Sequence, residues 1–191
     1  RSKNEQMFNI ALKFKNQGVL AIDLANDEAA VGLKVYADIY QEAQRQGLSI
    51  VVHAGEVYPS PDLAVALDLG VQRIGHAVFL PKYPDLMQEV ARRQIAIEVN
   101  PTSNLRTAAI ARYKDHPLKK FLEAGIPVIL GTDDPGLFGV NLTHEYLIAH
   151  RELGLTLGEL SNLSKNSINA SFLTNNRKQL LLEQWNQKSP N

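Results

Sequence analysis

Cysteine is absent from the 191 residues, so the chain can form neither a disulfide nor a thiolate metal site. No apolar run approaches the roughly 18–20 residues that a membrane-spanning helix needs, and the first residues lack a signal-peptide core. Charge of either sign is not in excess, with 20 Lys and Arg against 20 Asp and Glu. These absences argue against nucleic-acid and membrane partners and fit a cytoplasmic protein.

Extended and helical patterns alternate along the chain and indicate an α/β protein. Apolar runs predict strands that start near residues 19, 48, 72, 95 and 127, a spacing of 23 to 32 residues that is typical of a parallel sheet built from βα units. Ser2–Glu5 and Thr156–Glu159 have the pattern of capping boxes and predict the starts of two further helices. Helices between the strands are expected at 32–46, 61–69, 84–93 and 117–124.

A cluster of polar residues follows each predicted strand. The carboxyl ends of parallel strands form the binding face of an α/β sheet, so these clusters are expected to share one site. Helix capping explains Asp, Asn and Ser at such positions, but it does not call for His53 and His76. The five clusters are Asp23–Glu28, His53–Glu56, Gly75–His76, Asn100–Asn104 and Thr132–Pro135.

The residue types in these clusters suit metal-assisted acid–base chemistry. His53 and Asp133 offer nitrogen and oxygen ligands for zinc or another divalent metal. Glu56 can carry a proton beside a metal-bound water, and His76 can orient that water. Asp134 is expected to point toward a substrate. Two ligands are too few for a catalytic zinc, and no His-x-His occurs in the chain to supply the rest.

Four motifs in order resemble the adenosine deaminase family, and the resemblance spans nearly the whole chain. The motifs are His53–Glu56, Arg73–His76, Pro101–Asn104 and Thr132–Pro135, and the segment Ala21–Glu28 matches as well. The resemblance implies a TIM (β/α)8 barrel with one zinc, of which this chain holds strands 4 to 8. Residues 1–191 are therefore expected to form a single partial domain. They would need the N-terminal part of the barrel, from the same or another chain, which also holds two zinc-binding histidines.

The resemblance also implies the role of each site residue. His53 and Asp133 would be zinc ligands, and Glu56 would donate a proton to purine N1. His76 would hold the zinc-activated hydroxide that adds to C6, and Asp134 would bind N7. The implied reaction converts a 6-aminopurine nucleoside, with adenosine as the leading substrate, to inosine and ammonia.

Two candidate substrate-binding residues, Asn26 and Asp23, do not determine which 6-aminopurine is the substrate. Asn26 stands where the family has a glycine whose N–H meets purine N3, and its side chain would crowd the base or ribose. Asp23 is expected either to touch substrate or to cap the following helix, as are Asp27 and Glu28. The alternatives are deamination of adenine, N6-methyl-AMP or aminodeoxyfutalosine, another metal-dependent amidohydrolase reaction, and a non-catalytic barrel fragment.

Three further polar segments have simpler readings. His116, before Pro117, is expected to mark the entry of a helix. The segment 100–104 is expected to be either a turn and cap or part of the site. His144-Glu145 resembles the start of a zincin helix, but His150 follows six residues later instead of four, so we discard this reading.

Overall fold

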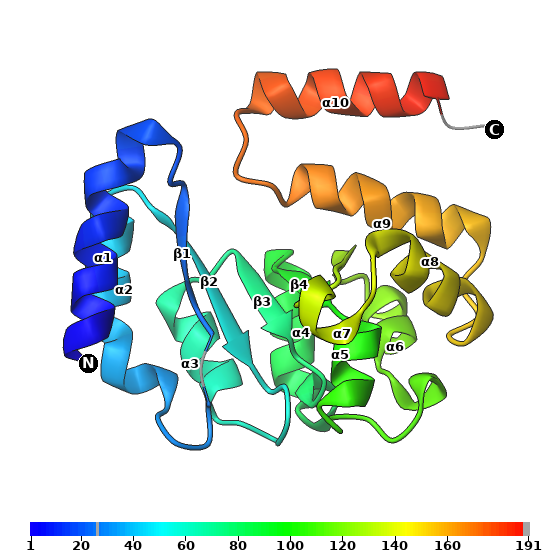
Figure 1. The fold of residues 1–191 in the computed structure, drawn as a ribbon, viewed down its shortest axis with the longest axis horizontal. Helices are drawn as coiled ribbons and strands as arrows, with labels where there is room; N and C mark the ends of the chain where they lie inside the picture. Colours follow the sequence, from blue (N-terminus) through cyan, green and yellow to red (C-terminus); the bar gives the residue numbers. More distant parts are fainter. Residues whose placement is uncertain (26, 189–191) are drawn as a thin grey trace.

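The computed structural model describes residues 1–25 and 27–188, and its centre is one parallel β-sheet (Figure 1). The strands lie in chain order, β1-β2-β3-β4-β5, and each pairs in parallel with the next. The expected α/β class with five parallel strands is therefore confirmed. The strand bounds are Ala21–Leu24 for β1, Ser49–Ala54 for β2, Arg73–His76 for β3, Ala96–Val99 for β4 and Val128–Leu130 for β5.

A helix connects each strand to the next, as parallel pairing requires. Helices α3 and α4 lie behind the sheet, and α9 and α10 pass one above the other at the end where the strands begin (Figure 1). The helices are α1 Ser2–Phe14, α2 Ala37–Arg45, α3 Asp62–Leu69, α4 Pro84–Arg93, α5 Pro101–Arg106, α6 Leu118–Glu123, α7 Pro135–Phe138, α8 Leu142–Arg151, α9 Leu157–Asn169 and α10 Asn175–Lys188. Among the described residues, no helix combines the length and the apolar character needed to cross a bilayer.

The hydrophobic core lies between the sheet and the helices behind it. Ile50, Val52 and Ala54 of β2 have no exposed surface and pack with apolar side chains of α3, α4 and α6. Successive side chains of a strand point to opposite faces, so His53 points to the other face, away from this core. The side of the sheet opposite these helices therefore carries the polar groups.

Two expected boundaries were wrong, and each has a physical reason. The first strand begins at Ala21, and it contains Asp23 because the backbone pairs with β2 from Ala21 to Leu24. The helix expected over 32–46 is divided, since Leu33–Tyr36 forms a 3-10 turn before α2. There the backbone N–H of Leu33 donates to the Asp62 carboxylate at 2.8 Å.

The two expected capping boxes differ in outcome. Thr156 and Glu159 form the reciprocal bonds of a capping box at the start of α9, which confirms that prediction. Ser2 does not cap α1: the helix begins at Ser2 itself, and Arg1 is the N-cap residue without a side-chain bond. The Glu5 carboxylate pairs instead with the Arg1 guanidinium at 2.9 Å.

Candidate active site

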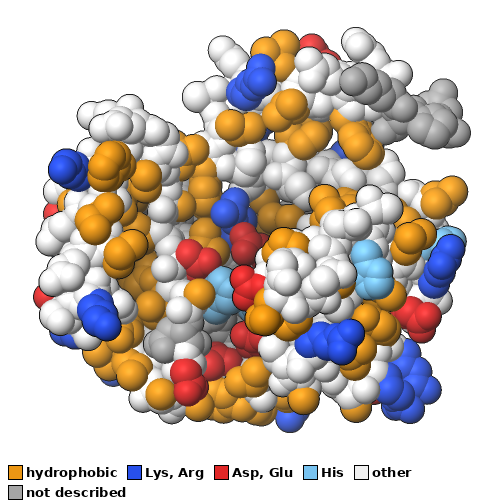
Figure 2. Space-filling view, in the orientation of Figure 1, with side chains coloured by type: hydrophobic (Ala, Val, Ile, Leu, Met, Phe, Trp, Pro, Cys, Tyr) orange, Lys and Arg blue, Asp and Glu red, His pale blue; other side chains and the backbone are white. Residues whose placement is uncertain are grey.

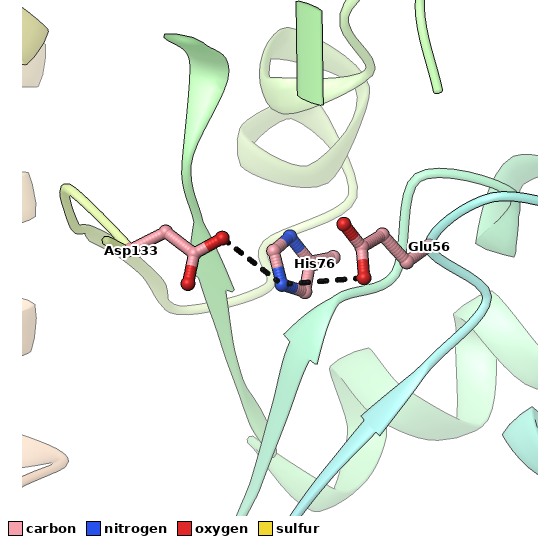
Figure 3. Close-up of side chains that lie close together, drawn as sticks. All are labelled: Glu56, His76 and Asp133. Atoms are coloured by element: carbon pink, nitrogen blue, oxygen red, sulfur yellow. Dashed lines mark ion pairs between the residues drawn. The ribbon is translucent and has the colours of Figure 1, made fainter. Parts of the chain in front are cut away.

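Acidic and histidine side chains gather in a hollow at the middle of one face of the molecule (Figure 2). Glu56, His76 and Asp133 meet at the carboxyl ends of the strands, and each offers a ligand atom within 4.8 Å of the others. His76 Nε2 lies 3.7 Å from Glu56 Oε2 and 3.9 Å from Asp133 Oδ2 (Figure 3). His76 is the last residue of β3, and Glu56 and Asp133 follow β2 and β5, so the strand ends bring together side chains that are up to 77 positions apart. The imidazole of His76 is buried between the two carboxylates, with 1% of its side chain exposed.

His53 stands beside this cluster at the end of β2. Its Nδ1 lies 3.2 Å from Asp23 Oδ1 of β1, and its ring centroid is 5.0 Å from that of His76. Gly75 makes room for the ring, because a Cβ at that position would approach His53 Cγ to 3.0 Å. Since a carboxylate can only accept, Nδ1 carries the hydrogen, which leaves Nε2 of the neutral ring as a free lone pair. A carboxylate behind a histidine is the arrangement that orients metal-binding imidazoles in proteins.

The backbone that presents His76 and Asp133 is strained. His76 has a φ of 64° and Asp133 a φ of 54°, both in the left-handed region that residues other than glycine adopt at a cost of roughly 1–3 kcal/mol. Surrounding contacts offset this cost. For Asp133, the Ser103 hydroxyl donates to Oδ2 at 2.6 Å. The strain turns both side chains toward the same point above the strand ends.

Glu28 holds the loop that carries Glu56. Its buried carboxylate accepts the backbone N–H of Gly55 at 2.7 Å and of Glu56 at 2.8 Å. The expectation that Glu28 caps a helix was wrong, because its acceptors are used on this loop. Asp27 Oδ1 accepts the N–H of Ala29 at 3.1 Å within a turn, so it does not cap the following helix either. The sequence offered one clue to this role. Glu28 follows the first strand, and the loop at Gly55 and Glu56, whose backbone N–H groups need an acceptor, follows the next strand.

Helix α5 supplies the other supports, and the segment 100–104 is more than a turn. Ser103 binds Asp133 as described, and Asn104 Nδ2 lies 2.9 Å from His76 Nδ1. Thr102 anchors the helix through its N–H, which donates to the buried Glu145 carboxylate at 3.1 Å. Three consecutive residues of α5 therefore support the site. The sequence pointed to the segment 100–104 but not to the partner of each residue.

The remaining candidates lie around the cluster or outside it. Asp134 is exposed at the N-cap position of α7, next to Asp133. Asn26 lies outside the described residues. His116 enters α6 as expected, because its Nδ1 accepts the N–H of Leu118 at 3.1 Å. His150 is used elsewhere, on the carbonyl of Leu155.

Burial and neighbouring charges move the pKa values of the clustered groups apart. Burial raises the pKa of Glu56 above its usual range; His53 opposes this rise, and Asp133 and Glu28 add to it. Burial and the charge of His53 lower the pKa of His76 to about 4. Burial also opposes charging of His53, but the hydrogen bond and charge of Asp23 outweigh it, so the pKa of His53 is raised. A carboxyl that holds its proton more readily beside a neutral imidazole is suited to proton transfer.

Comparison with known proteins identifies the family. A family model described as adenosine deaminase matches residues 1–188. The chain belongs to the adenosine deaminase family. Adenosine deaminase from Shewanella loihica is 37% identical over 172 residues, which cover 90% of this chain and 52% of that relative. Adenosine deaminase from Aliivibrio fischeri is 37% identical over 166 residues. The chain spans about half the length of the curated relatives that it matches.

Solved structures of adenosine deaminase family relatives share the fold. Adenine deaminase from Arthrobacter aurescens has a TM-score of 0.85 and 30% identity, and the match covers 94% of this chain and 57% of that one. The apo N6-methyl-AMP deaminase from Arabidopsis thaliana has a TM-score of 0.88 and 32% identity, with 97% and 54% covered. These matches confirm the expected barrel fold and show that the five strands correspond to about half of it.

Two related structures hold ligands. An amidohydrolase from Burkholderia ambifaria, solved with bound Zn, is 25% identical with a TM-score of 0.86 over 96% of this chain and 53% of that one. Arabidopsis ADAL in complex with IMP is 32% identical with a TM-score of 0.88 over 97% and 54%. Relatives of this adenosine deaminase family chain therefore include a zinc-binding protein and one that binds a purine nucleotide.

The donors in this chain fit a divalent metal such as zinc. His53 presents a free Nε2, fixed by the Asp23 carboxylate, and the Asp133 carboxylate lies at the same strand ends. Neutral imidazole nitrogen and carboxylate oxygen are both zinc ligands. These two donors are fewer than the three or more protein ligands that a catalytic zinc takes.

Proposed function

We propose that this chain forms the second half of a zinc-dependent deaminase that hydrolyses the 6-amino group of a purine nucleoside. Adenosine is the leading substrate, and inosine and ammonia are the products. The observation that carries the proposal is the meeting of Glu56, His76 and Asp133 within 4.8 Å, beside a His53 whose Nε2 is free for a metal. The match to curated adenosine deaminases, at 37% identity, supports adenosine as the leading substrate.

His53 and Asp133 would hold the metal in this proposal. Asp23 supports His53 from behind, and Ser103 supports Asp133, so both ligands are oriented before a metal binds. A bound zinc ion would supply the nucleophile at neutral pH by lowering the pKa of water. Two more ligands must come from the barrel strands that precede β1.

Glu56 would act as the proton carrier. Its raised pKa favours the protonated form, and its position on the Glu28-bound loop places its Oε2 3.7 Å from His76 Nε2. A proton delivered to purine N1 makes C6 more electrophilic, and the proton that water releases can return to Glu56 before ammonia leaves. His76, between Glu56 and Asp133, would hold the attacking water by donating a hydrogen bond from Nε2.

Asp134 and Asp23 would complete the substrate contacts. Asp134 is exposed beside Asp133 and is free to bind the base, as the family resemblance implies for N7. Asp23 is 40% exposed in its side chain, so it can orient His53 with one oxygen and meet the sugar with the other. Asn26 would set the tolerance for groups on the base or ribose.

The open edge of the sheet supports a barrel completed by further strands. In the described residues β1 pairs only with β2, and a cavity of about 330 Å³ lies between α1 and β1. Met7, Ile10 and Leu20 expose 63%, 48% and 48% of their surface along this side. An unpaired edge strand with apolar neighbours is suited to pairing with another strand. We propose that the N-terminal part of the barrel, in the same or another chain, covers it.

A substrate panel tests this function. The complete, metal-loaded deaminase is offered adenosine, adenine, AMP and N6-methyl-AMP, and release of ammonia is measured. We expect adenosine to be converted with the highest kcat/KM and about one zinc per active site. A folded and metal-loaded protein that is inert toward the whole panel would refute the proposal. Preference for N6-methyl-AMP would keep the reaction type and change the substrate.

A further inference from the structure

A chain of hydrogen bonds runs from helix α6 to the side of His76 that faces away from the hollow. The Leu118 N–H donates to His116 Nδ1 at 3.1 Å. His116 Nε2 lies 3.2 Å from Asn104 Oδ1, and Asn104 Nδ2 lies 2.9 Å from His76 Nδ1. All four residues are buried: His116 is 6% exposed, His76 1%, and Asn104 and Leu118 0%.

The first bond determines the direction of all the others. A backbone N–H can only donate, so His116 Nδ1 must accept and cannot carry a hydrogen. Burial lowers the pKa of His116 to about 3, so the ring is neutral and its one hydrogen is on Nε2. That hydrogen requires an acceptor, which is the Asn104 carbonyl oxygen. The amide of Asn104 is thereby held with its NH2 group toward His76.

The last bond then selects the tautomer of His76. An amide NH2 can only donate, so His76 Nδ1 accepts and carries no hydrogen. Neutral His76 therefore holds its hydrogen on Nε2, the nitrogen that lies 3.7 Å from Glu56 Oε2 and 3.9 Å from Asp133 Oδ2. An Nε2 that carries a hydrogen has no lone pair for a metal, although His76 lies within ligand distance of the cluster.

We propose that Asn104 and His116 are positioning residues that fix His76 as an Nε2–H hydrogen-bond donor toward the site and thereby keep it from binding the metal. The link to catalysis rests on the proposed deaminase function; the tautomer itself does not. His53 is the opposite case, because its Nδ1 donates to Asp23 and its Nε2 is left free. The two neighbouring histidines, whose rings are tilted by 56°, are thus given different roles by their partners: His76 is a hydrogen-bond donor and His53 is a candidate ligand.

Long-range ¹H–¹⁵N correlation spectra of the complete, ¹⁵N-histidine-labelled protein test the tautomers directly. The His76 signal is assigned by its loss in His76→Gln. We expect His76 and His116 to carry their hydrogen on Nε2, with and without zinc. His150 is an internal control with hydrogen on Nδ1, since that atom lies 2.7 Å from the Leu155 carbonyl oxygen. Hydrogen on His76 Nδ1, or on both ring nitrogens near neutral pH, would overturn the proposal.

The chain of hydrogen bonds from His116 through Asn104 to His76 is called the relay below. The substitution Asn104→Asp tests the relay, because it changes the hydrogen-bonding groups of the side chain and keeps the size of that side chain. A carboxylate accepts from both histidines, so His116 keeps its tautomer while His76 moves its hydrogen to Nδ1. We expect kcat to fall about 10–100-fold with a smaller change in KM. The matched control is Asn100→Asp, which places the same change at the buried N-cap of α5, where no histidine bond is formed, and leaves the His76 tautomer as in the wild type.

The outcomes separate this proposal from the proposed function. An unshifted His76 signal in folded Asn104→Asp, or a kcat equal to that of the wild type, would contradict the relay. If Asn104→Asp does not fold, the His76 tautomer measured in the wild-type protein decides whether the relay exists. An Nε2–H tautomer in a protein that is inert toward 6-aminopurines would support the relay and refute the deaminase assignment.

Discussion

Glu28 is expected to stabilise the catalytic loop by an amount that one substitution measures. In Glu28→Gln, one of the two acceptor oxygens becomes an NH2 group that faces a backbone N–H of Gly55 or Glu56, now 2.7 and 2.8 Å from the carboxylate. A hydrogen bond to a charged group contributes about 1.5–3 kcal/mol, and the carboxamide keeps one bond, so we expect the free energy of unfolding to fall by about 2–3 kcal/mol. At about 2–4 °C per kcal/mol for a domain of this size, the melting temperature would drop by about 4–12 °C.

Urea unfolding and steady-state kinetics of the complete protein check this magnitude. The control is Glu5→Gln, which removes an exposed ion pair with Arg1 and should lower the free energy of unfolding far less than Glu28→Gln does. We also expect turnover to fall about 10–100-fold in Glu28→Gln, because the loop that aims Glu56 is loosened. An unfolding free energy and a kcat both equal to those of the wild type would refute the reasoning.

Three other predictions concern stability, metal binding and completeness. The pKa of His116 is about 3 in the folded chain and about 6.5 unfolded, so the unfolded chain binds the proton in this window. The free energy of unfolding should fall by up to about 1.4 kcal/mol per pH unit as pH drops from about 6.5 to 3, and urea unfolding of His116→Gln should show a shallower slope. Gly75→Ala should weaken zinc binding in a chelator competition, because its methyl would lie 3.0 Å from His53 Cγ; unchanged affinity would exclude that contact. The isolated residues 1–191 should bind zinc weakly and be inactive, and full turnover would show that the ligand set is complete without other strands.

The sequence was sufficient for the parallel α/β layout and for the location of the site. Apolar strands at regular spacing are local patterns, and a polar cluster after each strand needs only the rule that parallel strands end together. Glu56, His76 and Asp133 were found in this way and do meet. Asp23 was expected after the first strand but lies within it, since no local pattern shows that β1 pairs with β2 as far as Leu24.

The supporting contacts were beyond local patterns. Glu28 binds amides 27 and 28 residues away, and Asn104 joins histidines that lie 28 residues before it and 12 after it. Each of these residues has an ordinary local explanation, as a helix cap or a turn, which satisfies the sequence pattern equally well. Only the fold shows that their polar groups are used on the site.

The zinc content and turnover of Glu56→Gln test the central claim most directly. Glu56 is assigned the proton and not the metal, so the variant of the complete protein should bind zinc at the wild-type stoichiometry of about one per site. Its rate of conversion of adenosine to inosine should fall by about 10²–10⁴ or more. A variant that loses the metal, or one that retains wild-type turnover, would contradict the account.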